Sequence, residues 1–145
     1  MLDLSLFTLC EAVELILRFY TFTSVFLQDE LDDIPEAKRF VEMGLTQEDE
    51  EYPDLQVLNA QGAAVLHEYI KFISDSFIKY MKKNGLEDTC QATAKWFHQE
   101  LNLQSEDDAE KIAEYICSNL HHYGYEVRKG YSRHKEELYR LEKCL

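Results

Sequence analysis

SEDDAEKIAEYICSNL, residues 105–120, carries the clearest periodic pattern in this chain of 145 residues. Its apolar residues recur every three or four positions, which is typical of a helix with one buried face. Ser105 stands three residues before Asp108, in the spacing of a capping box that has Asp in place of the usual Glu. The stretch therefore predicts a helix that begins after Ser105 and ends before Gly124. Its buried face should hold Ala109, Ile112, Ala113, Ile116, Cys117 and Leu120.

Helical patterns also cover most of the remaining sequence. Residues 20–26 are rich in Thr, Val and aromatic side chains and are also compatible with a strand, but no second strand-like run stands out to pair with them. The patterns therefore predict an all-α fold, a single-domain irregular bundle of five to six helices over residues 1–145. Besides residues 105–120, the expected helices are 3–28, one capped by Asp32 or Asp33 with Pro35 in its first turn and Gly44 after its end, 54–83, 87–101 and 126–144.

Acidic side chains are concentrated in the first part of the chain. The whole sequence has a net charge of −13, and residues 1–60 hold 14 acidic against three basic side chains. This balance makes direct nucleic-acid binding unfavourable, because binding to phosphates needs Lys and Arg. Capping a helix needs one or two acids, so the surplus is either a solvated face or a docking surface for a basic protein. The candidate partner-binding residues are Asp29, Glu30, Asp32, Asp33, Glu48, Asp49, Glu50 and Glu51.

The sequence contains no motif that fixes a chemistry. It has no P-loop, GxGxxG, GxSxG, HExxH or EF-hand pattern. Cys117 and His121 are four residues apart and could give two ligands to a soft metal, but no further ligands accompany them. We therefore expect no catalytic residues, no metal and no cofactor.

The cysteines and the N-terminal segment bear on the compartment. The four cysteines form no CxxC pair, which favours reduced thiols in a cytoplasmic protein. The apolar segment 1–27 is interrupted by Glu11, Glu14 and Arg18, which makes a membrane span unfavourable. It also lacks the basic start of a signal peptide.

Arg128 and His134 stand six positions apart near the C-terminus. Their spacing resembles the R-x4-6-H signature of HEPN ribonuclease domains, which are small, all-α and often dimeric. The resemblance rests on these two positions. It implies that Arg128 and His134 would flank the scissile phosphate of an RNA.

Three functions follow from these patterns. The leading expectation is a non-enzymatic acidic helical protein that binds, and inhibits or regulates, a basic protein partner. Immunity proteins and phage- or plasmid-borne inhibitors are also small, acidic and helical. This likeness is an analogy between classes of protein and does not imply common ancestry. The first alternative is a HEPN-like ribonuclease or a toxin–antitoxin component that uses Arg128 and His134. The second is a structural subunit that self-assembles, for example as a homodimer, through its C-terminal helix.

Overall fold

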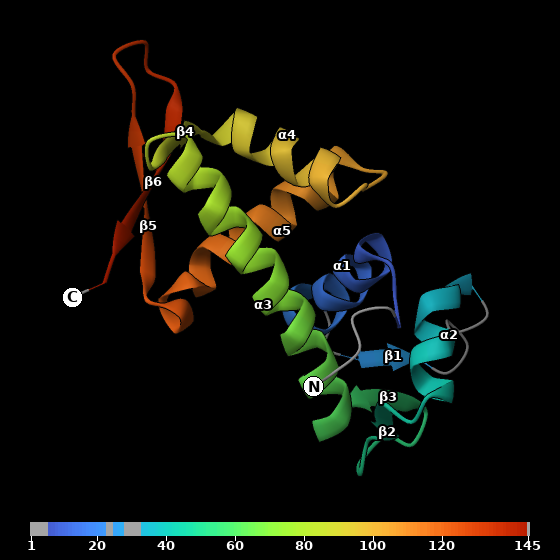
Figure 1. The fold of residues 1–145 in the computed structure, drawn as a ribbon. Coiled ribbons are helices and arrows are strands. Elements are labelled where there is room, and N and C mark those ends of the chain that lie inside the picture. Colours follow the sequence, from blue (N-terminus) through green and yellow to red (C-terminus); the bar gives the residue numbers. More distant parts are fainter. Residues whose placement is uncertain (1–5, 23–24, 28–32, 145) are drawn as a thin grey trace. The chain divides into compact units, whose positions relative to one another are not determined.

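The computed structural model describes residues 6–22, 25–27 and 33–144, and the chain divides into two compact units. Residues 1–69 form the N-terminal unit, and residues 70–145 form the C-terminal unit. Each unit combines helices with a three-stranded sheet (Figure 1). The predicted all-α class is therefore wrong, and the fold is a mixture of helices and sheets.

The N-terminal unit begins with α1, Leu9–Leu17, which continues as a short π-helix over residues 18–22. It continues with β1 (Val25–Leu27), α2 (Pro35–Glu42), β2 (Thr46–Glu48), β3 (Leu55–Leu58) and the first ten residues of α3 (Ala60–Lys83). The sheet has the order β1-β3-β2, and both pairs of strands are antiparallel.

Local sequence signals set the helix ends of this unit. Thr8 and Glu11 form a capping box at the start of α1, in which each side chain accepts a hydrogen bond from the other residue's backbone N–H. Pro35 occupies the first turn of α2, as predicted, and Gly44 follows that helix with a left-handed φ of 74°. The N-cap of α2 is Ile34, which has no side-chain capping bond, so the expected Asp cap is wrong.

The core of the N-terminal unit lies between α1, α2 and the start of α3. Phe40 packs its ring against Phe7 and Phe19, with centroid distances of 5.7 Å in both cases. Arg39 forms an ion pair of 2.7 Å with Glu11 and joins α2 to α1. The fully buried large side chains of this unit are Leu15, Ile16, Leu17, Phe40, Leu66 and Tyr69.

The first predicted helix is too long, because α1 ends at Leu17 and residues 25–27 form β1. The partner of β1 is β3, which lies within the segment 54–83 that was predicted to be one helix. The strand alternative for residues 20–26 therefore holds for residues 25 and 26. The cap of α3 is Asn59, whose Oδ1 accepts a hydrogen bond from the Gly62 N–H at 2.8 Å.

The C-terminal unit starts with the second part of α3. It then contains β4 (Glu87–Thr89), α4 (Cys90–Glu100), α5 (Glu106–Asn119), a 3-10 turn (Leu120–Tyr123), β5 (Tyr125–Tyr131) and β6 (Glu137–Lys143). Its sheet is antiparallel with the order β4-β6-β5. Helices α4 and α5 pack against each other and against this sheet (Figure 1).

The helix predicted around residues 105–120 is confirmed. The Ser105 Oγ accepts a hydrogen bond from the Asp108 N–H at 3.3 Å at the start of α5. Gly124 follows the 3-10 turn with a left-handed φ of 84°. Aromatic side chains of α3 and α4 form another part of the core, where the Phe77 ring lies 5.2 Å from Phe97 and 6.0 Å from Trp96.

The predicted C-terminal helix is wrong, because residues 125–143 form the antiparallel hairpin of β5 and β6. Val127 and Leu141 are cross-strand neighbours, and Leu141 is buried. His134 is exposed in the turn between the strands. The homodimer that was expected to form through this helix therefore lacks its predicted element, and self-assembly itself stays a prediction. The Tyr and Val residues at alternate positions 125, 127 and 131 favour a strand.

Candidate functional site

The structure places the predicted partner-binding residues on separate segments. Asp29, Glu30 and Asp32 lie outside the described residues. Asp33 is exposed two residues before α2. The other four residues, 48–51, lie together at the end of β2 and in the loop that follows it.

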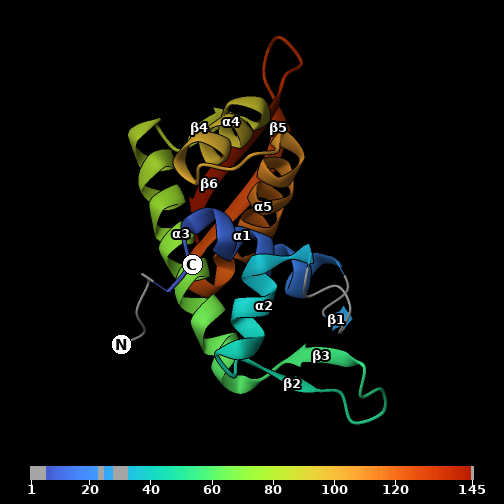
Figure 2. The same ribbon diagram turned by 90° about the vertical axis from the view of Figure 1, so that its right-hand side faces the viewer.

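We call residues 48–54, the last residue of β2 and the connection to β3, the acidic loop. Its ends are held by the antiparallel register, in which Glu48 faces Gln56. The backbone closes it further, because the Asp49 N–H donates to the Leu55 carbonyl at 3.0 Å and the Leu55 N–H donates to the Tyr52 carbonyl at 2.9 Å. Figure 2 shows the loop as the free end of the β2–β3 hairpin.

The acidic loop carries five acidic residues and one aromatic residue, Tyr52. The side chains of Glu48, Glu50, Glu51 and Asp54 are exposed, and Asp49 is half-buried. None of these five acids takes part in an ion pair within the described part of the chain. Tyr52 lies among them with 62% of its surface exposed. An exposed Tyr beside unneutralised carboxylates is a feature of protein-binding surfaces, because Tyr gives a large contact area and a polar tip.

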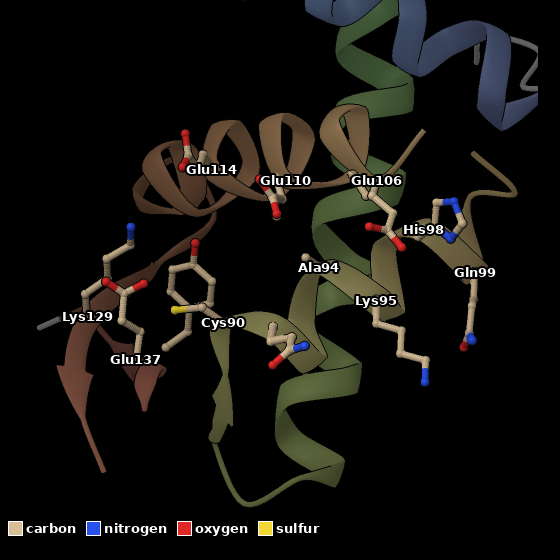
Figure 3. A pocket seen from close by; sticks show the side chains of 14 residues that line it. Cys90, Ala94, Lys95, His98, Gln99, Glu106, Glu110, Glu114, Lys129 and Glu137 are labelled. Carbon is tan, nitrogen blue, oxygen red and sulfur yellow. The ribbon is translucent and has the colours of Figure 1, made fainter. Parts of the chain in front are cut away.

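The C-terminal unit contains a pocket of about 690 Å³, which lies between α4, α5 and the β5–β6 hairpin. This volume is in the range of small-molecule sites. Figure 3 shows Glu106, Glu110 and Glu114 in a row along α5, with Lys129 and Glu137 of the hairpin at one end of the row. His98 of α4 lies near the other end.

Acids outnumber bases around the pocket. Glu106, Glu110, Glu114 and Glu137 line it together with Lys95 and Lys129. None of the four carboxylates forms an ion pair with another described residue. The three carboxylates on α5 are spaced by four residues and therefore recur about every 6 Å along the helix.

The inner wall of the pocket is apolar or weakly polar. It includes Ala94, Ala109 and Ala113 together with Cys90 and the buried Tyr139. Cys90 and Tyr139 lie close enough to each other to influence each other's ionisation. The three alanines keep this wall hollow, because a larger residue at any of them would extend into the space between the helices.

Burial determines the ionisation of the groups behind this wall. Desolvation raises the pKa of the Cys117 thiol to about 12, and it also raises the pKa values of Cys90 and Tyr139. The two thiols are therefore neutral near pH 7. Since the thiolate is the reactive nucleophile, Cys90 is unsuited to nucleophilic catalysis in this state.

Arg128 and His134 do not form the pair that the HEPN resemblance implies. Arg128 lies on β5 with its Nε 3.0 Å from a Glu142 carboxylate oxygen, and His134 lies in the exposed turn. The all-helical setting of the HEPN signature is absent. The ribonuclease activity stays a prediction that no feature of the described residues favours.

No third metal ligand joins Cys117 and His121 among the described residues. Among residues 6–22, 25–27 and 33–144, no group of three or more His, Cys, Asp or Glu side chains is placed to hold a metal ion. No helix in that part of the chain combines the length and the apolar character that crossing a membrane requires.

Local sequence patterns predict the acidic loop but not the pocket. The spacing of Glu106, Glu110 and Glu114 was visible as a row on one helix face. Lys129, Glu137 and Tyr139 could not be added to that row, because residues 126–144 were predicted to be helical. Only the β5–β6 hairpin brings them opposite α5.

Comparisons with known protein families, with curated proteins and with solved structures find no match to this chain.

Proposed function

We propose that this protein is a non-enzymatic binding protein whose acidic loop docks onto a basic protein partner and inhibits or regulates it. The observation that carries the proposal is the exposed Tyr52 ring among five carboxylates that have no described ion-pair partner. Tyr is one of the residues that contribute most to binding energy at interfaces.

Charge supports a basic partner for this surface. The net charge of −13 attracts cationic proteins at a distance, and the loop concentrates that charge on one hairpin. Complementary charges mainly increase the association rate, which then falls as salt screens the attraction. The paired strands β2 and β3 hold the loop, so less ordering is required on binding.

The test compares three forms of the full chain as bait in the source lysate, with captured proteins quantified by mass spectrometry. The first is the wild type. The second is E48Q/D49N/E50Q/E51Q, which neutralises the loop. The third is the matched control E42Q/D75N/E100Q/E136Q, which removes the same number of Glu and Asp charges at exposed positions elsewhere.

We expect a stoichiometric basic protein on the wild type and on the control variant, and its loss from the loop variant. With the purified partner, the loop variant should associate more slowly and its rate should depend less on salt. Equal capture by the loop and control variants would contradict the proposal, because the loop would then contribute only general charge. Circular dichroism of each variant checks that its fold is kept.

A cytoplasmic location remains part of this proposal. It is supported by the four cysteines, all of which are thiols in the structure.

A further inference from the structure

We propose that the pocket between α4, α5 and the β5–β6 hairpin binds a linear aliphatic polyamine of the spermidine type. This inference concerns the C-terminal unit alone and is independent of the acidic loop. It rests on a hollow of about 690 Å³ that is lined by three alanines, Cys90 and Tyr139 as well as by four carboxylates.

The row of carboxylates matches the repeat of such a ligand. Glu106, Glu110 and Glu114 cover about 12 Å in steps of about 6 Å along α5. In an extended polyamine, nitrogens joined by three or four methylene groups lie about 5–6 Å apart at ordinary bond lengths. Successive ammonium groups can therefore face successive carboxylates, while the methylene groups lie against Ala109 and Ala113.

One end of the pocket already holds an ammonium group of the chain. The Nζ of Lys129 lies 5.6 Å from the centre of the Tyr139 ring, in a cation–π contact. Glu114 is close enough to Tyr139 to influence its ionisation, and Glu137 influences Cys90 in the same way. Glu114 and Glu137 lie at the same end of the pocket as Lys129 (Figure 3), so this end offers carboxylates to a primary ammonium of the ligand.

The mixed lining argues against other small ligands. Anions would be repelled by the four carboxylates. A bare divalent cation would make no use of the alanine side chains of the lining. It also finds no cluster of three ligands within the described residues. An amine with several charges and an apolar chain uses both parts of the lining. Its carboxylate contacts are charge-assisted hydrogen bonds, which are among the stronger ones in proteins.

The experiment is a calorimetric titration of the full chain with spermidine at 150 mM salt. E110Q/E114Q changes two exposed rim residues, and E48Q/E50Q removes the same charge from the acidic loop as the matched control. We expect one site with a 1:1 stoichiometry, and affinity at least tenfold weaker in E110Q/E114Q and nearly unchanged in E48Q/E50Q. Equal losses in the two variants would overturn the proposal, because spermidine would then be a general counterion.

Ala94→Leu gives a second test that leaves the charge unchanged. Ala94 lines the pocket, so the larger side chain should fill it and weaken spermidine binding. Lys129→Ala should strengthen binding more than Lys135→Ala, which removes the same charge from the exposed hairpin turn. Unchanged binding in A94L, or no binding by the wild type, would overturn the proposal even if the acidic loop binds a protein.

Discussion

The hydroxyl of Tyr69 is hydrogen-bonded to both backbone groups of Phe7. It accepts from the Phe7 N–H at 2.8 Å and donates to the Phe7 carbonyl at 2.9 Å. The two residues are 62 positions apart in sequence, and Tyr69 is only 1% exposed. A single side chain of α3 thus holds the segment that leads into α1.

Tyr69→Phe should lower the free energy of unfolding by about 1–3 kcal/mol. The ring remains, but the buried N–H and carbonyl of Phe7 lose their partner, and an unsatisfied buried polar group costs this amount. Denaturant unfolding followed by circular dichroism measures the change. Tyr52→Phe is the matched control and should leave stability unchanged, because Tyr52 is exposed. A Tyr69→Phe protein as stable as the wild type would show that this bond pair adds nothing.

Gly62→Ala should destabilise the N-terminal unit, although Ala is the better helix former by about 1 kcal/mol. A Cβ at Gly62 would lie 2.0 Å from the backbone oxygen of Leu45, so the chain before β2 would have to move. We expect a loss of about 1–3 kcal/mol, in the range of core overpacking. The control is Gly130→Ala, where a Cβ meets nothing within 4 Å. Thermal unfolding gives the melting temperature of each variant. Equal melting temperatures would contradict the close approach of Gly62 to the Leu45 backbone.

Cys117 should resist alkylation in the folded protein. Burial raises its pKa from 9.0 to about 12, so at pH 8 only about one molecule in ten thousand carries the thiolate. Iodoacetamide at pH 8 should modify the exposed Cys144 first and Cys117 only after unfolding, as peptide mass spectrometry would detect. Rapid labelling of Cys117 in the native protein would contradict its burial.

The same shift makes stability depend on pH in the alkaline range. Because the folded thiol has the higher pKa, the unfolded chain loses its proton first. Cys117 therefore lowers stability as the pH rises from 9 towards 12, and it has no effect below that range. Cys117→Ala should reduce this alkaline loss, measured by denaturant unfolding at pH 8 and pH 10.

Tyr52→Ala should shorten the lifetime of the complex with the proposed basic partner. The substitution removes the ring and the contact area that it would bury against the partner. The surrounding charges that guide association remain. We expect dissociation at least tenfold faster with little change in the association rate, measured by surface plasmon resonance. Tyr52→Phe should keep most of the lifetime. A normal lifetime for Tyr52→Ala would place the binding energy elsewhere.

The sequence by itself determined the features that depend on neighbouring residues. Ser105 and the apolar repeat predict α5, Pro35 and Gly44 mark the two ends of α2, and the acidic loop is recognisable from its composition. Each of these signals acts within a few residues, through capping, a preferred φ or the helical period. The row formed by Glu106, Glu110 and Glu114 belongs to the same class.

Only the tertiary structure decided where the strands are. Residues 25–27 become β1 because residues 55–58 pair with them, and residues 125–131 become β5 because residues 137–143 return beside them. A strand needs a partner to satisfy its backbone groups, and that partner is not visible in local periodicity. The pocket follows from the same pairing, since it places Lys129 beside Tyr139 and both opposite α5.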